Sequence, residues 1–222
     1  MPQIFTASAD TRLRTGMLLI VLTFAVCLLF LGGFMDSTYG TMVGWVRDQP
    51  VPFSHAHHVG GLGIDCRYCH TTVEVSAQAS LPPTHVCMTC HSQLWTGAPM
   101  LAPIRQSLAD DKPIAWRRVA RLPDYVYFNH SIHISRGVPC AACHGRVDRM
   151  PLMTRAEPFH MSFCLDCHRD PGPHLRPVDQ VTRMDWTDWD NHPERHEAFG
   201  RQAMQHFHIE PAKLVNCSIC HR

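Results

Sequence analysis

Ten of the eleven cysteines in this 222-residue chain fall into five Cys-x-x-Cys pairs, and a histidine directly follows every pair. Two thiols at this spacing can each form a thioether to one vinyl group of a haem, and the histidine then ligates the iron from below. A zinc ribbon also uses paired cysteines, but it does not require a histidine after each pair. The motifs therefore predict five covalently bound haem c groups.

The residues of the five motifs divide into two predicted roles. The predicted thioether cysteines are Cys66, Cys69, Cys87, Cys90, Cys140, Cys143, Cys164, Cys167, Cys217 and Cys220. The predicted proximal iron ligands are His70, His91, His144, His168 and His221.

The chain between the motifs favours little regular structure. It contains 17 prolines, and no strand-like alternation persists for six residues. We expect a mostly irregular, small-α fold with few or no strands, in which short helical turns carry the motifs and the haems form the core. The best longer helix outside the membrane covers residues 193–208, because Pro193 suits the first helical position and Glu194 and Glu197 follow in the early turns.

An uncharged apolar run covers residues 16–34 and nearly matches the ~30 Å hydrocarbon core of a bilayer. A cleaved signal peptide is the alternative, but the run is long for one and no Ala-x-Ala site follows it. We therefore expect a retained single-pass anchor in the cytoplasmic membrane, in contact with membrane lipid. Arg12 and Arg14 precede the run and predict a cytoplasmic N-terminus, with the haem-bearing part on the periplasmic side. Cys27, inside the run, is expected to be an ordinary small apolar residue.

A repeat organises the motifs. Phe-x-His-x-x-His occurs at residues 53–58 and again at 128–133, each time before two haem motifs. The pattern predicts a tandem duplication of a dihaem module, followed by a fifth haem. The expected parts are a cytoplasmic tail (1–15), the span (16–34), a linker (35–50), the first module (51–107), the second module (108–176) and a C-terminal segment with the fifth haem (177–222).

Five six-coordinate irons need five distal ligands. The Phe-x-His-x-x-His element resembles that of small multihaem cytochromes of the c3 and c7 type, where its two histidines serve two different haems. By that resemblance, the distal ligands of four haems are His55, His58, His130 and His133. The distal ligand of the remaining haem is undecided between methionine and histidine, and a methionine ligand would raise the potential of that haem. The candidates are Met161, Met153, His160 and His206, with His208 as a further possibility.

Composition and motif type reduce the number of functions that this chain could have. A formal net charge of +1 without a polybasic tract gives no case for nucleic acid. The remaining alternatives are an electron conduit, a multihaem reductase with one open catalytic haem, and a stand-alone quinol dehydrogenase of the NapC/NrfH type. All five motifs end in histidine, with no Cys-x-x-Cys-Lys variant, and little polypeptide surrounds each haem. These features favour a conduit that is not an enzyme by itself.

Four longer blocks after Pro50 are similar to the pentahaem cytochrome c subunit of alternative complex III. They cover residues 52–71, 123–133, 143–152 and 163–169. The resemblance implies a relay in a membrane complex that oxidises quinol and passes electrons outward on the periplasmic side. It also implies three kinds of partner: an iron–sulfur subunit related to molybdopterin oxidoreductases, polytopic quinol-binding subunits, and other cytochrome c subunits.

Overall fold

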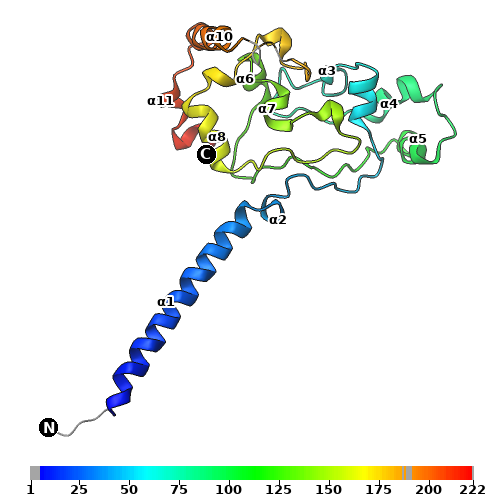
Figure 1. Cartoon of the computed structure of the whole chain (residues 1–222). Coiled ribbons are helices and arrows are strands. Elements are labelled where there is room, and N and C mark those ends of the chain that lie inside the picture. Colours follow the sequence, from blue (N-terminus) through cyan, green and yellow to red (C-terminus); the bar gives the residue numbers. More distant parts are fainter. Residues whose placement is uncertain (1–5, 187, 189–191, 222) are drawn as a thin grey trace. The chain divides into compact units, whose positions relative to one another are not determined.

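The computed structural model describes residues 6–186, 188 and 192–221 (Figure 1). The chain divides into two compact units, the first ending at Val43 and the second beginning at Gly44. The first unit contains α1 (Ala7–Asp36) and the short α2 (Thr38–Thr41), which begins where the Ser37 hydroxyl accepts a hydrogen bond from the Gly40 amide.

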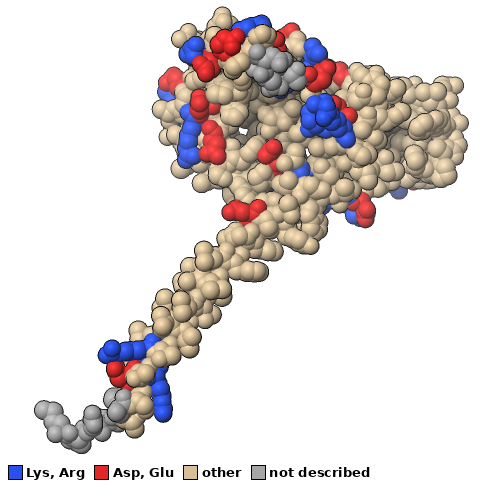
Figure 2. All heavy atoms as spheres, viewed as in Figure 1, with Lys and Arg blue, Asp and Glu red and all other residues tan. Residues whose placement is uncertain are grey.

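Helix α1 is longer than the apolar run that predicted it. It begins at Ala7, because residues 7–15 contain no helix breaker and Arg14 pairs with Asp10 one turn earlier. Its most apolar stretch has a mean hydropathy of 2.7, with no residue buried. Figure 2 shows charged side chains near its N-terminal end and none along the apolar stretch. The helix is therefore long and apolar enough to cross a membrane, as the sequence predicts.

The second unit consists of short helices joined by irregular chain. They are η1 (Ala56–Gly61, a π-helix), α3 (Cys66–Cys69), α4 (Thr84–His91), η2 (Pro99–Leu101), α5 (Ala102–Ala109), α6 (His130–Ser135), α7 (Cys140–His144), η3 (Val147–Arg149), α8 (Met161–Arg169), η4 (Gly172–His174), η5 (Val178–Gln180), α10 (Pro193–His206), α11 (Pro211–Leu214) and α12 (Cys217–Cys220). The β pairing in the described part of the chain is one isolated bridge between Val46 and Thr154. The expected irregular, small-α fold is confirmed.

Helix α10 begins at Pro193, as predicted, but it ends two residues early. Phe207 caps it at φ −90° and ψ 4°, and His208 has a φ of +51°. A left-handed residue of this kind cannot continue a right-handed helix. Glu194 lies in the first turn, where a carboxylate favours the positive end of the helix dipole.

The side-chain core of the second unit is small. Ten apolar side chains are buried among the described residues. One cluster joins Val51, Leu101 and Ile104, and a second joins Val73, Ile134 and Val181. Domains of this length usually bury a larger share of their apolar surface. The small clusters agree with the expectation that bound haems supply much of the interior.

Candidate haem sites

Each Cys-x-x-Cys pair occupies a helical turn, as expected from the sequence. The pairs lie in α3, α4, α7, α8 and α12. Residues three apart on a helix face the same side, so the two thiols of each pair point in a common direction. The turn closes at the following histidine: the His70 amide donates to the Cys66 carbonyl and the His221 amide to the Cys217 carbonyl, each at 2.9 Å. No disulfide joins any of the eleven cysteines, all of which the structure describes.

The two Phe-x-His-x-x-His copies adopt nearly the same ring geometry, although η1 is a π-helix and α6 an α-helix. Phe53 lies edge-on to His55, with ring centres 4.8 Å apart, and stacks on His58 at 4.4 Å. In the second copy, the phenylalanine lies edge-on to the first histidine at 4.7 Å and stacks on the second at 4.5 Å. The phenylalanine therefore fixes both histidine planes in each copy.

Main-chain carbonyls hold seven of the site histidines through Nδ1. A carbonyl oxygen only accepts, so these Nδ1 atoms carry the proton and the Nε2 atoms keep the lone pair that binds a metal. The seven contacts, at 2.7–3.2 Å, are His58 to Ser54, His70 to Ser80, His91 to Leu94, His130 to Ala77, His133 to Asn129, His168 to Leu214 and His221 to Tyr125.

Three predicted distal histidines each lie opposite a predicted proximal histidine. The ring centres are 6.2 Å apart for His58 and His91, 6.5 Å for His130 and His144, and 6.1 Å for His133 and His168. A metal–nitrogen bond of about 2 Å, plus about 1 Å from nitrogen to ring centre, places two axial imidazoles about 6 Å apart. The residues present therefore fit an iron held between each pair.

The fourth predicted distal histidine, His55, lies near His70. Burial, then the charges of His70, His58 and His144, lowers the pKa of His55 to about 4. Burial, then His130 and His70, lowers the pKa of His144 to about 4 as well. Both imidazoles are therefore neutral near pH 7, which is the form that binds a metal.

The cysteines show how the first three motifs follow one another in space. Burial, and then the neighbouring Cys87 thiol, raises the pKa of Cys69, so the first and second motifs are neighbours. The Cys66 and Cys140 thiols are close enough to shift each other's pKa, that of Cys140 upward and that of Cys66 downward. The first motif therefore also touches the third.

The fourth and fifth motifs extend this series of neighbouring sites. Burial, then Cys167 and Cys164, raises the pKa of Cys143 to about 11, which places the fourth motif beside the third. Burial, and then Cys220, raises the pKa of Cys164, which places the fifth beside the fourth. Along these contacts the motifs run in the spatial order second, first, third, fourth, fifth.

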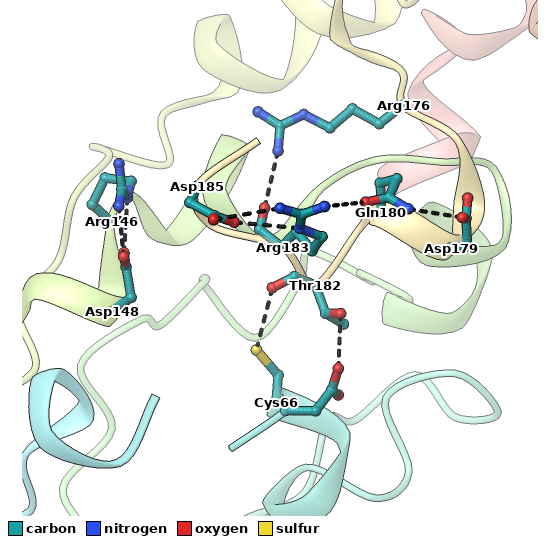
Figure 3. A network of polar contacts seen from close by, with 10 residues as sticks. Cys66, Arg146, Asp148, Arg176, Asp179, Gln180, Thr182, Arg183 and Asp185 are labelled. Carbon is teal, nitrogen blue, oxygen red and sulfur yellow. Dashed lines mark hydrogen bonds and ion pairs between the residues drawn. The ribbon is translucent and has the colours of Figure 1, made fainter. Parts of the chain in front are cut away.

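A polar segment around Thr182, which no motif indicated, lies beside the first site, where the Cys66 thiol donates to the Thr182 carbonyl at 3.9 Å (Figure 3). The Thr182 hydroxyl donates to the Asp65 carboxylate at 3.0 Å, and the Cys140 amide donates to the Val181 carbonyl at 3.0 Å. Arg176 donates to the Arg183 carbonyl and so braces the same turn. Of these residues, only Asp65 has a role that local sequence could predict, because an aspartate directly before a helical turn is a typical N-cap. Its side chain accepts a hydrogen bond from the Arg67 amide.

The fifth motif has a different environment. Among the described residues, the ring of His221 stacks on Tyr125, with centres 5.8 Å apart, and not on a histidine. The Tyr127 amide donates to the Cys220 carbonyl at 2.8 Å. The chain that precedes the second Phe-x-His-x-x-His copy therefore supports the proximal side of this site.

The candidates for the fifth distal position are spread over different elements. Met161 begins α8 and is 69% exposed, and His160 directly precedes that helix. Met153 is half-buried next to Thr154 of the isolated bridge. His206 is exposed on the last turn of α10, with its ring against Phe207. Met161 lies one turn before Cys164, the cysteine next to Cys220.

Comparison with known proteins supports a multihaem cytochrome c. Over 125 residues the chain is 31% identical to the multihaem cytochrome c subunit of the menaquinone reductase of Nitratidesulfovibrio vulgaris. The alignment covers 56% of this chain and 53% of the relative, so the chain spans about half the length of the curated protein that it matches. A scan against profiles of known protein families finds no match.

We expect His58→Ala to turn one haem of the oxidised protein from low-spin to high-spin, because the iron opposite His91 would lose its second imidazole. Electron paramagnetic resonance measures the change. His57→Ala is the matched control: His57 lies in the same turn, but its ring stacks on Trp95 at 5.8 Å. A high-spin signal of equal size in both variants would contradict the assignment of His58.

Proposed function

We propose that this chain is the electron-transfer subunit of a membrane quinone-linked complex and relays electrons through five c-type haems on the periplasmic side. The observation that carries the proposal is the placement of predicted distal histidines opposite the proximal histidines of successive motifs. In the proposed topology α1 is the single-pass anchor, its N-terminus is cytoplasmic, and the haem-bearing unit is periplasmic.

The haems, when bound, supply one-electron redox chemistry, and the chain's residues hold them in place. The cysteines would attach each group. Paired imidazoles would hold the irons of the second, third and fourth motifs, and His55 with His70 would hold that of the first. A filled coordination sphere leaves no site for a substrate on those irons. Main-chain carbonyls orient seven of the nine site imidazoles, and hydrogen bonding of this kind also tunes the potential of an iron. Such residues suit a relay better than a reductase.

Two similarities point to the kind of complex. The relative in N. vulgaris is named as a subunit of a menaquinone reductase, and the sequence blocks resemble the pentahaem subunit of alternative complex III. Both are quinone-linked. We propose the alternative complex III arrangement, with quinol as the electron source. Its partners are a molybdopterin-oxidoreductase-like iron–sulfur subunit, polytopic quinol-binding subunits and further cytochrome c subunits.

A redox titration of the purified complex tests this function and its direction. We expect five haems with a spread of potentials that bracket the quinol and a periplasmic acceptor, because coordination, hydrogen bonding and exposure differ among the sites. Absorbance of the reduced haem bands against applied potential measures this. Potentials all far below that of menaquinol would contradict quinol oxidation and favour electron flow toward the quinone.

We also propose that electrons pass along the haems in the order second, first, third, fourth, fifth, or the reverse. The effects of neighbouring thiols on one another's pKa support this order: Cys87 on Cys69, Cys66 and Cys140 on each other, Cys164 on Cys143, and Cys220 on Cys164. The second and fifth haems are then the two ends of the relay.

Iron positions test the order directly. Anomalous diffraction at the iron edge from crystals of the loaded protein locates each iron without reference to the polypeptide. We expect the shortest iron–iron separations between the haems of Cys87 and Cys66, Cys66 and Cys140, Cys140 and Cys164, and Cys164 and Cys217. A second haem that lies nearer the third than the first would contradict the proposed path.

For the fifth iron we propose Met161 as the distal ligand. Met161 and Cys164 share one face of α8, and Cys164 is the neighbour of Cys220 in the fifth motif. The exposed thioether is also free of the packing contacts that hold a buried methionine in place. A methionine ligand would give this terminal haem a higher potential than its neighbours with two histidine ligands.

We expect Met161→Ala to remove the far-red absorption band that marks methionine-ligated ferric haem and to lower the highest potential in the titration. Met153→Ala is the matched control and should change neither. Loss of the band in the control alone would assign Met153 instead. A high-spin ferric signal in the parent protein would overturn methionine ligation and favour the alternative function, a reductase with an open fifth iron.

A further inference from the structure

A charged cleft lies on the second unit, apart from the haem motifs. It has a volume of about 680 Å³ and is lined by Arg47, Asp48, Arg117, Arg118, Arg121 and Asp124. Four arginines against two aspartates leave a surplus of positive charge. None of these residues takes part in the contacts that define the haem sites, so the cleft needs an explanation of its own.

The main chain that carries the arginines is held by side-chain hydrogen bonds. The Gln49 amide pairs with Arg117 in both directions, accepting from its N–H at 2.9 Å and donating to its carbonyl at 2.8 Å. Arg47 donates to the Arg118 carbonyl at 2.9 Å. Arg155 donates to the Arg121 carbonyl at 2.7 Å. The 117–121 segment is therefore fixed at three points against chain that is distant in the sequence.

The positive charge in this cleft is poorly neutralised. Arg121 and Asp124 are 3.9 Å apart, and their side chains are 66% and 94% exposed, so this pair contributes little. The ion pairs of the described residues include none with Arg117 or Arg118. Burial, and then the charge of Arg47, lowers the pKa of Arg155, so arginines crowd one another here.

Arginines carried on a fixed main chain, two of them outside any ion pair among the described residues, suit a phosphate. The planar fork of a guanidinium donates two parallel hydrogen bonds to phosphate oxygens, and the interaction is strongest where several forks converge. The volume of the cleft also lies in the range of small-ligand sites, about 300–1,000 Å³. An anion with a phosphate group would offset the surplus positive charge of the cleft.

The sequence around the cleft favours a lipid as the source of that phosphate. Arg47 follows the last residue of α1 by only eleven positions, and Trp45, two residues before it, is 46% exposed. Tryptophan and arginine next to an apolar span are typical of residues at the membrane–water interface. Anionic headgroups attract arginines that lie near the membrane surface.

We propose that this cleft binds the phosphate of an anionic phospholipid headgroup. The inference rests on α1 remaining in the membrane, but it does not depend on the haem order or on the identity of the complex. The lipid would hold the haem-bearing unit at the membrane surface through a contact additional to α1.

The full-length, haem-loaded protein in a nonionic detergent provides the test. Isothermal titration calorimetry measures the affinity for three ligands: short-chain phosphatidylglycerol, short-chain phosphatidylcholine and inorganic phosphate. We expect phosphatidylglycerol to bind at least about tenfold more tightly than either alternative, since its charge is anionic and its tails remain at the micelle. The double variant Arg117→Gln/Arg118→Gln should lose about tenfold or more of that affinity.

Arg201→Gln is the matched control, because Arg201 is also exposed but lies on α10 and pairs with Glu197. The haem absorption spectrum confirms that each variant is loaded and folded. Equal binding of the two lipids, or full binding by the double variant, would overturn the proposal. Inorganic phosphate that binds as tightly as phosphatidylglycerol would overturn the lipid source. If the double variant still bound the lipid but no longer co-purified with an acidic partner subunit of the complex, the cleft would be a protein interface instead.

Discussion

The hydrogen bond from a histidine Nδ1 to a main-chain carbonyl is the interaction on which the candidate sites depend. It is made within a turn by His58 and His133, and between distant segments by His130, His168 and His221. Each bond sets which nitrogen carries the proton and limits rotation of the ring. In a chain with so small a side-chain core, these bonds also join segments that apolar packing does not. The long-range bond from His168 to Leu214 fastens α11 beside α8, and that from His221 to Tyr125 fastens the chain end to residue 125.

Local sequence predicted what local geometry decides. Each Cys-x-x-Cys-His predicted a helical turn, and the two Phe-x-His-x-x-His copies predicted a duplicated unit. Both follow from spacing within six residues, and Phe53 and Phe128 pack on their histidines in the same way. The start of α10 at Pro193 was predictable for the same reason. The end of α10 was not predictable. The residue with left-handed backbone there is His208, and not the glycine or asparagine that usually marks such a position in a sequence.

The sequence alone did not predict contacts between distant segments. The Cys66–Cys140 contact and the turn around Thr182 join residues more than 70 positions apart, and neither has a pattern that periodicity can reveal. The spatial order of the motifs therefore became visible only with the structure. The arginine cleft is a similar case, since Arg47 and Arg117 lie in separate stretches of unremarkable composition and meet only through Gln49 and the carbonyls of the 117–121 segment.

The contact between Cys66 and Cys140 has a consequence for the origin of the chain. These two residues hold the same position, the first cysteine of the first motif, in the two Phe-x-His-x-x-His modules. The two predicted modules therefore meet at this pair of equivalent residues, as the subunits of an isologous dimer do at a two-fold axis. A homodimer of a single dihaem module would make the same contact about a two-fold axis. Gene duplication and fusion would then have converted that dimer into one polypeptide, with both outer ends of the pair left open to further partners.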